Sequence, residues 1–125
     1  MKVLSLFDGL SGARVALMRA GFKIDKYYAS EIDKYAIQIA QKNYPNTTQI
    51  GDIKDIRFFN GTLHWGKNME VENVGNIDLI VGGSTCKDLY IAKKNRQGLK
   101  GERSGLFFEY VRILKEVKPK WFVLE

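Results

Sequence analysis

The sequence predicts an α/β fold built on a parallel sheet, and three observations point to it. Short apolar runs alternate along the chain with segments whose apolar residues recur at helical spacing. The predicted strand Ile77–Val81 ends in the apolar residues Leu79–Val81 and closes on two glycines, which is typical of a strand buried on both faces of a parallel sheet. Pro45 and Pro119 each end a helical pattern. With 125 residues, we expect one domain, 1–125, with a real hydrophobic core.

The first strand is predicted over Val3–Phe7 and runs into a glycine-containing turn. Ser11 or Asp8 is expected to cap a helix that runs to about Ala20, where Gly21 stops it. Strand, turn and helix together open a nucleotide-binding half-fold, although the turn lacks the Gly-x-Gly-x-x-Gly of dinucleotide sites. The residues expected on the buried face of this helix are Ala13, Ala16, Leu17 and Ala20.

The second strand is predicted over Tyr27–Ser30, and a helix over Asp33–Tyr44 follows it. Glu31 comes directly after the strand and lies twenty-two residues beyond Gly9. That spacing is close to the roughly 20 residues at which an acid meets ribose hydroxyls in such folds. A surface acid that caps the next helix would lie at the same position, so spacing alone leaves both interpretations open. The residues expected to face inward from the helix are Ala36, Ile39, Ala40 and Tyr44.

The second half of the chain supplies two more strands. Thr48–Ile50 is predicted as the third strand, whereas residues 57–76 show no sustained periodicity and predict no regular element. Ile77–Val81 is the fourth strand, Gly105–Val117 a helix with a clear apolar stripe, and Trp121–Leu124 the fifth strand. Right-handed crossovers then predict the strand order 3-2-1-4-5.

Chemistry-bearing side chains follow four of these strands. Asp8, Glu31 and Asp52 follow the first three, and Cys86 follows the fourth and its glycines. Ligands of open α/β sheets bind at the carboxyl ends of the strands, so these residues are expected at one ligand-binding edge. Cys86, the chain's only cysteine, is therefore placed like a nucleophile. A buried, inert cysteine is the alternative.

Composition narrows the setting of the protein. One cysteine excludes an intramolecular disulfide and favours a reducing, cytoplasmic compartment. With one histidine and one cysteine, the chain has too few of the usual ligands for a zinc site made of protein side chains alone, so no metal is predicted. No stretch approaches the ~20 apolar residues that cross a membrane, so no membrane association is expected.

Positive charge is concentrated in one stretch. The chain has 20 Lys and Arg against 14 Asp and Glu, for a formal net charge of +6. The stretch directly after Cys86 alone carries a net charge of +4. Such a stretch beside a candidate active site suits a polyanion such as DNA, although a solvated basic loop is the simpler alternative. The candidate DNA-binding residues are Lys87, Lys93, Lys94, Arg96, Lys100 and Arg103.

Together these motifs resemble the amino-terminal catalytic half of the DNA cytosine-C5 methyltransferases. The resemblance covers nearly the whole chain, with the motifs in order and at workable spacing. The matching segments are Phe7–Gly12, the S-adenosylmethionine turn; Tyr28–Asp33, the ribose-binding strand end; Gly51–Ile53, beside the adenine; Gly83–Cys86, the nucleophile; Gly105–Phe107, the helix start beside the cofactor; and Glu125, the glutamate of Glu-Asn-Val.

The resemblance implies a Rossmann-like fold and methyl transfer from S-adenosylmethionine to C5 of cytosine in DNA. Cys86 would be the thiolate that adds to C6 of the base, and Glu125 would hold N3. Base flipping would need a loop that closes over the nucleophile, and the basic stretch after Cys86 fits that role. The implied cofactor-binding residues are Phe7, Asp8, Gly9, Leu10, Ser11, Gly12, Glu31, Ile32, Asp52, Ile53, Gly82 and Leu106.

The sequence departs from the family pattern at two positions and in its extent. Thr85 replaces the proline before the nucleophile, and Lys87 replaces the usual Gln or Asn after it. The family's later strands, base-contacting arginine and target-recognition domain have no counterpart, so we expect a partial domain that is inactive alone. It would be completed by a second polypeptide, be an excised piece of a longer enzyme, or be a phage-type, catalytically dead derivative that binds proteins. A nucleotide-binding module of the dehydrogenase type is disfavoured by the missing glycine fingerprint and by Cys86.

The last predicted strand, Trp121–Leu124, is expected to lie at an edge of the sheet. It is apolar and contains no lysine or proline that would blunt an exposed edge. Pairing with a complementing half, a second copy or another protein is therefore expected there.

Overall fold

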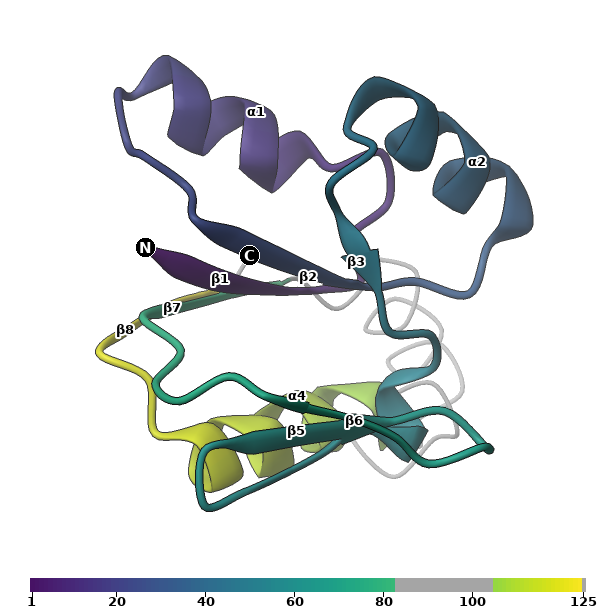
Figure 1. Cartoon of the computed structure of the whole chain (residues 1–125), viewed down its shortest axis with the longest axis vertical. Helices are drawn as coiled ribbons and strands as arrows, with labels where there is room; N and C mark the ends of the chain where they lie inside the picture. Colours follow the sequence, from purple (N-terminus) through teal and green to yellow (C-terminus); the bar gives the residue numbers. More distant parts are fainter. Residues whose placement is uncertain (83–104, 125) are drawn as a thin grey trace, which may run out of the picture.

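The computed structural model describes residues 1–82 and 105–124. These residues form two sheets and three α-helices, drawn in chain order in Figure 1. The elements are β1 (Lys2–Leu6), α1 (Gly12–Arg19), β2 (Lys26–Ser30), α2 (Lys34–Asn43), β3 (Thr48–Gln49), the 3-10 turn η1 (Ile53–Asp55), β4 (Arg57–Phe59), β5 (Thr62–Trp65), β6 (Glu70–Asn73), β7 (Leu79–Gly82), α4 (Gly105–Val117) and β8 (Trp121–Leu124).

The main sheet has the order β3-β2-β1-β7-β8, with every neighbouring pair parallel. This is the predicted order 3-2-1-4-5, so the predicted α/β, Rossmann-like class and its topology are confirmed. The central position of β1 in the sheet explains its apolar sequence. Val3 and Leu4 are both fully buried, because elements cover the sheet on each side of this strand.

The small sheet, β4-β5-β6, is antiparallel and was not predicted, since residues 57–76 show no long alternation. Its strands are only three or four residues long. A local signal exists in the dipeptide Asn60-Gly61, whose φ angles of 49° and 76° form the tight hairpin turn that Asn-Gly favours. Phe59 and Thr62 are the paired residues that flank it.

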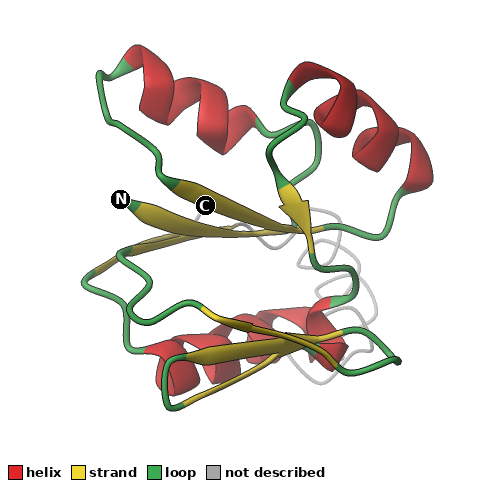
Figure 2. Ribbon diagram, viewed as in Figure 1, coloured by secondary structure: helices red, strands yellow, loops and turns green. Residues whose placement is uncertain are grey.

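The layers are visible in Figures 1 and 2, where α1 and α2 lie on one side of the main sheet and α4 and the small sheet on the other. We call the side facing α4 and the small sheet the closed face, and the side facing α1 and α2 the open face. The larger core lies on the closed face, where Leu4, Tyr28 and Ile80 pack with Tyr110 and Ile113 of α4. The open face has a smaller buried cluster: Val3, Tyr27, Ala29 and Leu79.

The helices of the open face lie close to their predicted bounds but bury less than predicted. Asp33 caps α2 by accepting hydrogen bonds from Tyr35 N and Ala36 N, and Gly21, at φ 88°, follows α1. The predicted inward positions Ala16, Ala20 and Ile39 are exposed, however. Within the described part of the chain, the open face offers these helices less neighbouring structure to pack against than helical spacing alone assumes.

Candidate cofactor site

The turn after β1 approaches the ends of the neighbouring strands at the carboxyl edge of the main sheet. Asp8 N donates to the carbonyl of Ser30, the last residue of β2, at 3.0 Å. Phe7, Gly9 and Ser11 all have left-handed backbones, with φ of 57°, 60° and 64°. Two of these residues are not glycine, and such residues rarely adopt this conformation without compensating contacts. The turn is therefore held in shape by its surroundings.

Asp8 supplies much of that hold and is buried, with 8% of its surface exposed. Ser11 Oγ donates to one carboxylate oxygen at 2.6 Å, and Tyr27 OH donates to the other at 2.6 Å. Burial together with the neighbouring Asp8 carboxylate raises the pKa of Tyr27. Asp8 is thus occupied inside the protein, where it fixes the turn against β2.

Neither the Ser11 hydroxyl nor the Asp8 carboxylate caps α1. Ser11 stands at the N-cap position, but its left-handed backbone and its bond to Asp8 direct the hydroxyl away from the helix. Its backbone N–H donates to the Asp8 carbonyl at 3.1 Å. The predicted cap is therefore wrong, because the turn's internal hydrogen bonds compete for the same side chains.

Arg14 on α1 is a buried residue that the sequence interpretation missed. Its guanidinium donates to Thr47 Oγ1 at 2.5 Å and to Asn46 Oδ1 at 2.8 Å. It also lies over the rings of Tyr27 and Tyr44, at 5.1 and 4.8 Å from their centroids. Arg14 joins α1 to the segment between α2 and β3 and so supports the turn from behind. The sequence signal for a buried arginine was its position beside alanines that were themselves expected to be buried.

Glu31 directly follows β2, and its carboxylate accepts hydrogen bonds from two backbone segments, the glycine turn and the residues after Glu31. One carboxylate oxygen accepts from Gly9 N at 2.7 Å, and the other accepts from Ile32 N and Asp33 N at 2.9 and 3.0 Å. Asp33 caps α2, and Glu31 stays a predicted partner of the ribose. It anchors the start of the α2 segment, and it links the glycine turn to the strand end. The oxygen bonded only to Gly9 retains capacity for a further donor.

A small hollow of about 60 Å³ opens beside Glu31, and we call it the Glu31 hollow. Its lining comes from four separate parts of the chain, and six of the seven lining residues are predicted cofactor-binding residues. The lining combines the carboxylates of Glu31 and Asp52 with apolar side chains such as Phe7 and Leu106. The lining residues are Phe7, Ser30, Glu31, Ile32, Asp52, Ile53 and Leu106.

Asp52 shares its carboxylate between this hollow and the backbone. Its Oδ1 accepts from Lys54 N at 2.9 Å and caps η1. Ser30, the lining residue that was not predicted, donates from Oγ to the Gly51 carbonyl at 2.8 Å and so ties β2 to the segment that carries Asp52.

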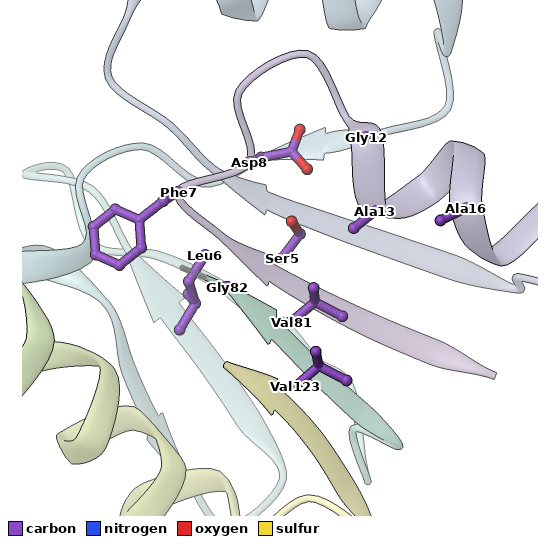
Figure 3. A pocket seen from close by; sticks show the side chains of 10 residues that line it. All are labelled: Ser5, Leu6, Phe7, Asp8, Gly12, Ala13, Ala16, Val81, Gly82 and Val123. Atoms are coloured by element: carbon purple, nitrogen blue, oxygen red, sulfur yellow. The ribbon is translucent and has the colours of Figure 1, made fainter. Parts of the chain in front are cut away.

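A second hollow of about 390 Å³ lies on the open face, and we call it the Val81 hollow. Figure 3 shows Ser5, Val81 and Val123 rising from three neighbouring strands toward the side on which Ala13 and Ala16 of α1 lie. Four predicted cofactor-binding residues also line it: Phe7, Asp8, Gly12 and Gly82. Phe7 borders both hollows, so they flank a single aromatic side chain.

The remaining predicted residues divide into two groups. Leu10 is 58% exposed and lines neither hollow, and Gly9 contributes its N–H to Glu31. The predicted catalytic and DNA-binding residues lie outside the described part of the chain: Cys86, Lys87, Lys93, Lys94, Arg96, Lys100, Arg103 and Glu125. Within residues 1–82 and 105–124, no group of acidic, His or Cys side chains is arranged to hold a metal, and no helix is long and apolar enough to cross a membrane.

The strand order, the tight turn after β1 and the acid-lined hollow at the carboxyl edge are those of a Rossmann-like α/β domain. The family model for C-5 cytosine-specific DNA methylases matches residues 1–125, and the chain belongs to this family.

Individual relatives agree with this assignment. The chain is 35% identical over 127 residues to the orphan methyltransferase M.SPRI of Bacillus phage SPR, and 36% identical over 124 residues to the DNA (cytosine-5)-methyltransferase DRM2 of Arabidopsis thaliana. These alignments cover 100% and 96% of this chain but only 26% and 19% of the two relatives. An E. coli prophage protein assigned as a DNA modification methyltransferase superposes with a TM-score of 0.69 at 26% identity, over 99% of this chain and 31% of that protein.

Proposed function

We propose that this chain is the cofactor-binding and nucleophile-bearing part of a DNA cytosine-C5 methyltransferase. The observation that supports it best is the convergence of Phe7, Glu31, Asp52 and Leu106, from four separate parts of the chain, on one hollow. Family membership supports S-adenosylmethionine as the ligand there. The carboxylate of Glu31 would accept from the ribose hydroxyls, and the apolar side formed by Phe7, Ile53 and Leu106 would contact the adenine.

In the proposed chemistry, Cys86, Glu125 and the basic stretch after Cys86 have separate roles. Bound S-adenosylmethionine would supply an activated methyl group. Cys86, as a thiolate, would add to C6 of a flipped cytosine and make C5 nucleophilic, while Glu125 would hold N3. Once C5 carries the methyl group, loss of the C5 proton and elimination of the Cys86 thiolate would release the base. The basic residues from Lys87 to Arg103 would contact phosphates.

Binding of the cofactor is tested by titration calorimetry with S-adenosylhomocysteine. We expect Glu31→Gln to weaken binding about 10-fold, because it removes the charge. The amide keeps one oxygen for Gly9 N, but its NH2 group cannot accept from Ile32 N and Asp33 N. Glu70→Gln, an exposed glutamate on β6, is the matched control and should bind as the wild type does. Equal affinity for the wild type and Glu31→Gln would remove the assignment of Glu31 to the ribose.

We further propose that a polypeptide of these 125 residues alone transfers no methyl group. The supporting observation is that it corresponds to only 19 to 26% of the relatives described above. A tritiated-methyl assay on mixed-sequence DNA tests this. Transfer that is lost in Cys86→Ser would contradict the proposed inactivity and, at the same time, support Cys86 as the nucleophile.

DNA binding through the stretch after Cys86 is a separate part of the proposal. Neutralising about three phosphates would give a log–log salt slope of roughly −3. Fluorescence anisotropy with a mixed-sequence duplex at several salt concentrations measures the slope. An affinity that stays constant between low and moderate salt would leave the basic stretch as solvated surface. DNA as a partner also fits the cytoplasmic compartment that the single cysteine favours.

The alternative proposal is a catalytically dead, methyltransferase-derived binding protein, and β8 is the observation that favours it. All four of its residues, Trp121–Leu124, are exposed, and the strand is the last in the sheet order. An exposed apolar edge pairs readily with another chain, which would be a complementing half, a second copy or an unrelated protein. Light scattering on the wild type and on Val123→Lys tests this. Monomers for both at tens of micromolar would contradict pairing through β8.

A further inference from the structure

Arg112 on α4 connects that helix to the turn that forms one side of the Glu31 hollow. Its Nη2 donates to the Ile53 carbonyl at 3.0 Å, and its Nη1 donates to the Ile56 carbonyl at 2.9 Å. Ile53 opens η1 and Ile56 closes it. One guanidinium therefore spans the whole turn, which the planar fork of arginine can do and a single ammonium group cannot.

Two carboxylates on the same helix hold this guanidinium in place. Arg112 Nε donates to Glu109 at 2.6 Å, and Nη1 also donates to Glu116. The other oxygen of Glu116 accepts from Phe58 N at 2.9 Å, at the start of the small sheet. Partial burial of Arg112 disfavours its charge, but the two carboxylates outweigh this and raise its pKa. The pair Arg112–Glu116 thus fixes the segment after η1 as well as η1 itself.

The turn held by Arg112 carries part of the hollow's lining. The side chain of Ile53 is 4% exposed and lines the Glu31 hollow, while its carbonyl is the group that Arg112 holds. Leu106, near the start of the same helix, also lines that hollow. α4 therefore supplies Leu106 directly and fixes Ile53 through Arg112, so one rigid element sets the spacing between these two apolar residues.

We propose that Arg112 is a positioning residue for ligand binding in the Glu31 hollow, acting through the Ile53 carbonyl on the apolar wall that receives the adenine. This inference rests on the proposed function, since it assigns the ligand of that hollow as S-adenosylmethionine or its demethylated product. Arg112 does not line the hollow; its effect on affinity comes from the position of Ile53 relative to Leu106.

The test is titration calorimetry with S-adenosylhomocysteine on the wild type, Arg112→Lys and Glu116→Gln. Arg112→Lys keeps the positive charge beside Glu109 and Glu116 but cannot bridge both carbonyls, and we expect about 10-fold weaker binding. Glu116→Gln keeps an acceptor for Phe58 N and loosens the guanidinium, so a loss of about 3-fold is expected.

Arg57→Met is the matched control because Arg57 donates to the same turn from an exposed position. Its Nη1 bonds to the Lys54 and Ile56 carbonyls, each at 2.8 Å, but does not bond to Ile53. We expect unchanged affinity for this variant. Hydrogen exchange distinguishes positioning from a general loss of stability. Arg112→Lys should speed exchange at Asp55 N and Ile56 N, which close η1, and leave the β1 and β2 amides protected.

The outcomes separate the two proposals. No binding by the wild type overturns the proposed function. Binding by the wild type with equal affinity in Arg112→Lys overturns the positioning role and leaves the proposed function standing. An equal loss of affinity in Arg57→Met also overturns the positioning role, because removing any contact to the turn would then weaken binding as much as removing the bond to Ile53. If Arg112→Lys melts below the assay temperature, wild-type affinity in Glu116→Gln overturns the role.

Discussion

The closed and open faces of the main sheet differ in how completely they are covered. Among residues 1–82 and 105–124, thirteen buried residues form the cluster on the closed face, against four on the open face. Adjacent tyrosines show the contrast within one strand. Tyr28 faces the closed side and donates to Glu72 of the small sheet, whereas Tyr27 faces the open side and donates to Asp8 of the glycine turn. Both rings are about 1% exposed.

The difference teaches how the fold divides its tasks. On the closed face, β2 is bonded to a second sheet, so packing there secures the domain. On the open face, the same strand is bonded to the turn that borders both hollows. Stability should therefore depend mainly on the closed face. The hollows draw on both faces, because the Glu31 hollow is also lined by Ile53 and Leu106 of the closed face. Five substitutions test this comparison, from the largest expected effect to the smallest.

Neighbouring residues of β7 give the largest contrast. Ile80 is fully buried on the closed face, whereas Val81 is half-buried and borders the Val81 hollow. Ile80→Ala should cost about 3–4 kcal/mol and Val81→Ala about 1 kcal/mol, since a side chain beside an open hollow leaves little new cavity. Urea unfolding measures both. Equal costs would show that the two faces contribute alike.

Gly82 tests how closely the closed face is packed. A Cβ at this position would lie 2.8 Å from the Leu6 carbonyl oxygen and 2.8 Å from Tyr110 Cε2. Gly82→Ala should therefore cost about 2 kcal/mol, because backbone cannot move aside cheaply. Urea unfolding of the apo protein checks this in the absence of any ligand. A variant as stable as the wild type would mean that glycine is needed there only for the ligand.

Tyr110 tests the link between α4 and β8. Its hydroxyl donates to the Val123 carbonyl at 2.8 Å, so Tyr110→Phe should cost about 1 kcal/mol at neutral pH. Burial raises the pKa of Tyr110 from 10 to about 12. Because the folded pKa is the higher one, the stabilisation is complete below pH 10 and is lost as the pH rises from 10 to about 12. Stability measured across that range should fall less steeply in Tyr110→Phe than in the wild type.

The smallest effect is expected for an added side chain on the open face. Ala16 is exposed and borders the Val81 hollow of about 390 Å³. Ala16→Leu should change stability by less than about 0.5 kcal/mol, since the hollow has room and leucine is a good helix former. Thermal unfolding measures it. A loss of more than about 1 kcal/mol would mean that α1 already packs tightly there.

The parts of the fold that local chemistry decides were predictable from the sequence. The apolar run of β1 and the glycine stop of α1 at Gly21 each depend on neighbouring residues alone. The strand order followed from the handedness of parallel crossovers. The lining of the Glu31 hollow was predictable because parallel strands bring residues such as Glu31 and Asp52 to one edge.

The parts that depend on contacts between distant residues were not predictable. The side chain of Ser11 had two possible partners, and Asp8 takes it because Tyr27, from the next strand, orders that carboxylate. Ile39 fits the apolar spacing of α2 but is 47% exposed, since spacing does not report how much covers a face. The roles of Arg14 and Arg112 depend on partners more than thirty residues away in sequence.

The position of β1 in the middle of the main sheet has a consequence for folding. β1 pairs with β2 nearby in sequence, but its other edge pairs with β7, and Lys2 N bonds to Asp78 across a separation of 76 residues. At a synthesis rate of roughly 5–20 residues per second, that edge would wait roughly 4–15 seconds for its partner. Contacts this distant in sequence also slow refolding. The most buried strand of the finished protein is thus the one left longest with an unpaired edge during synthesis, when a chaperone or a neighbouring nascent chain can reach it.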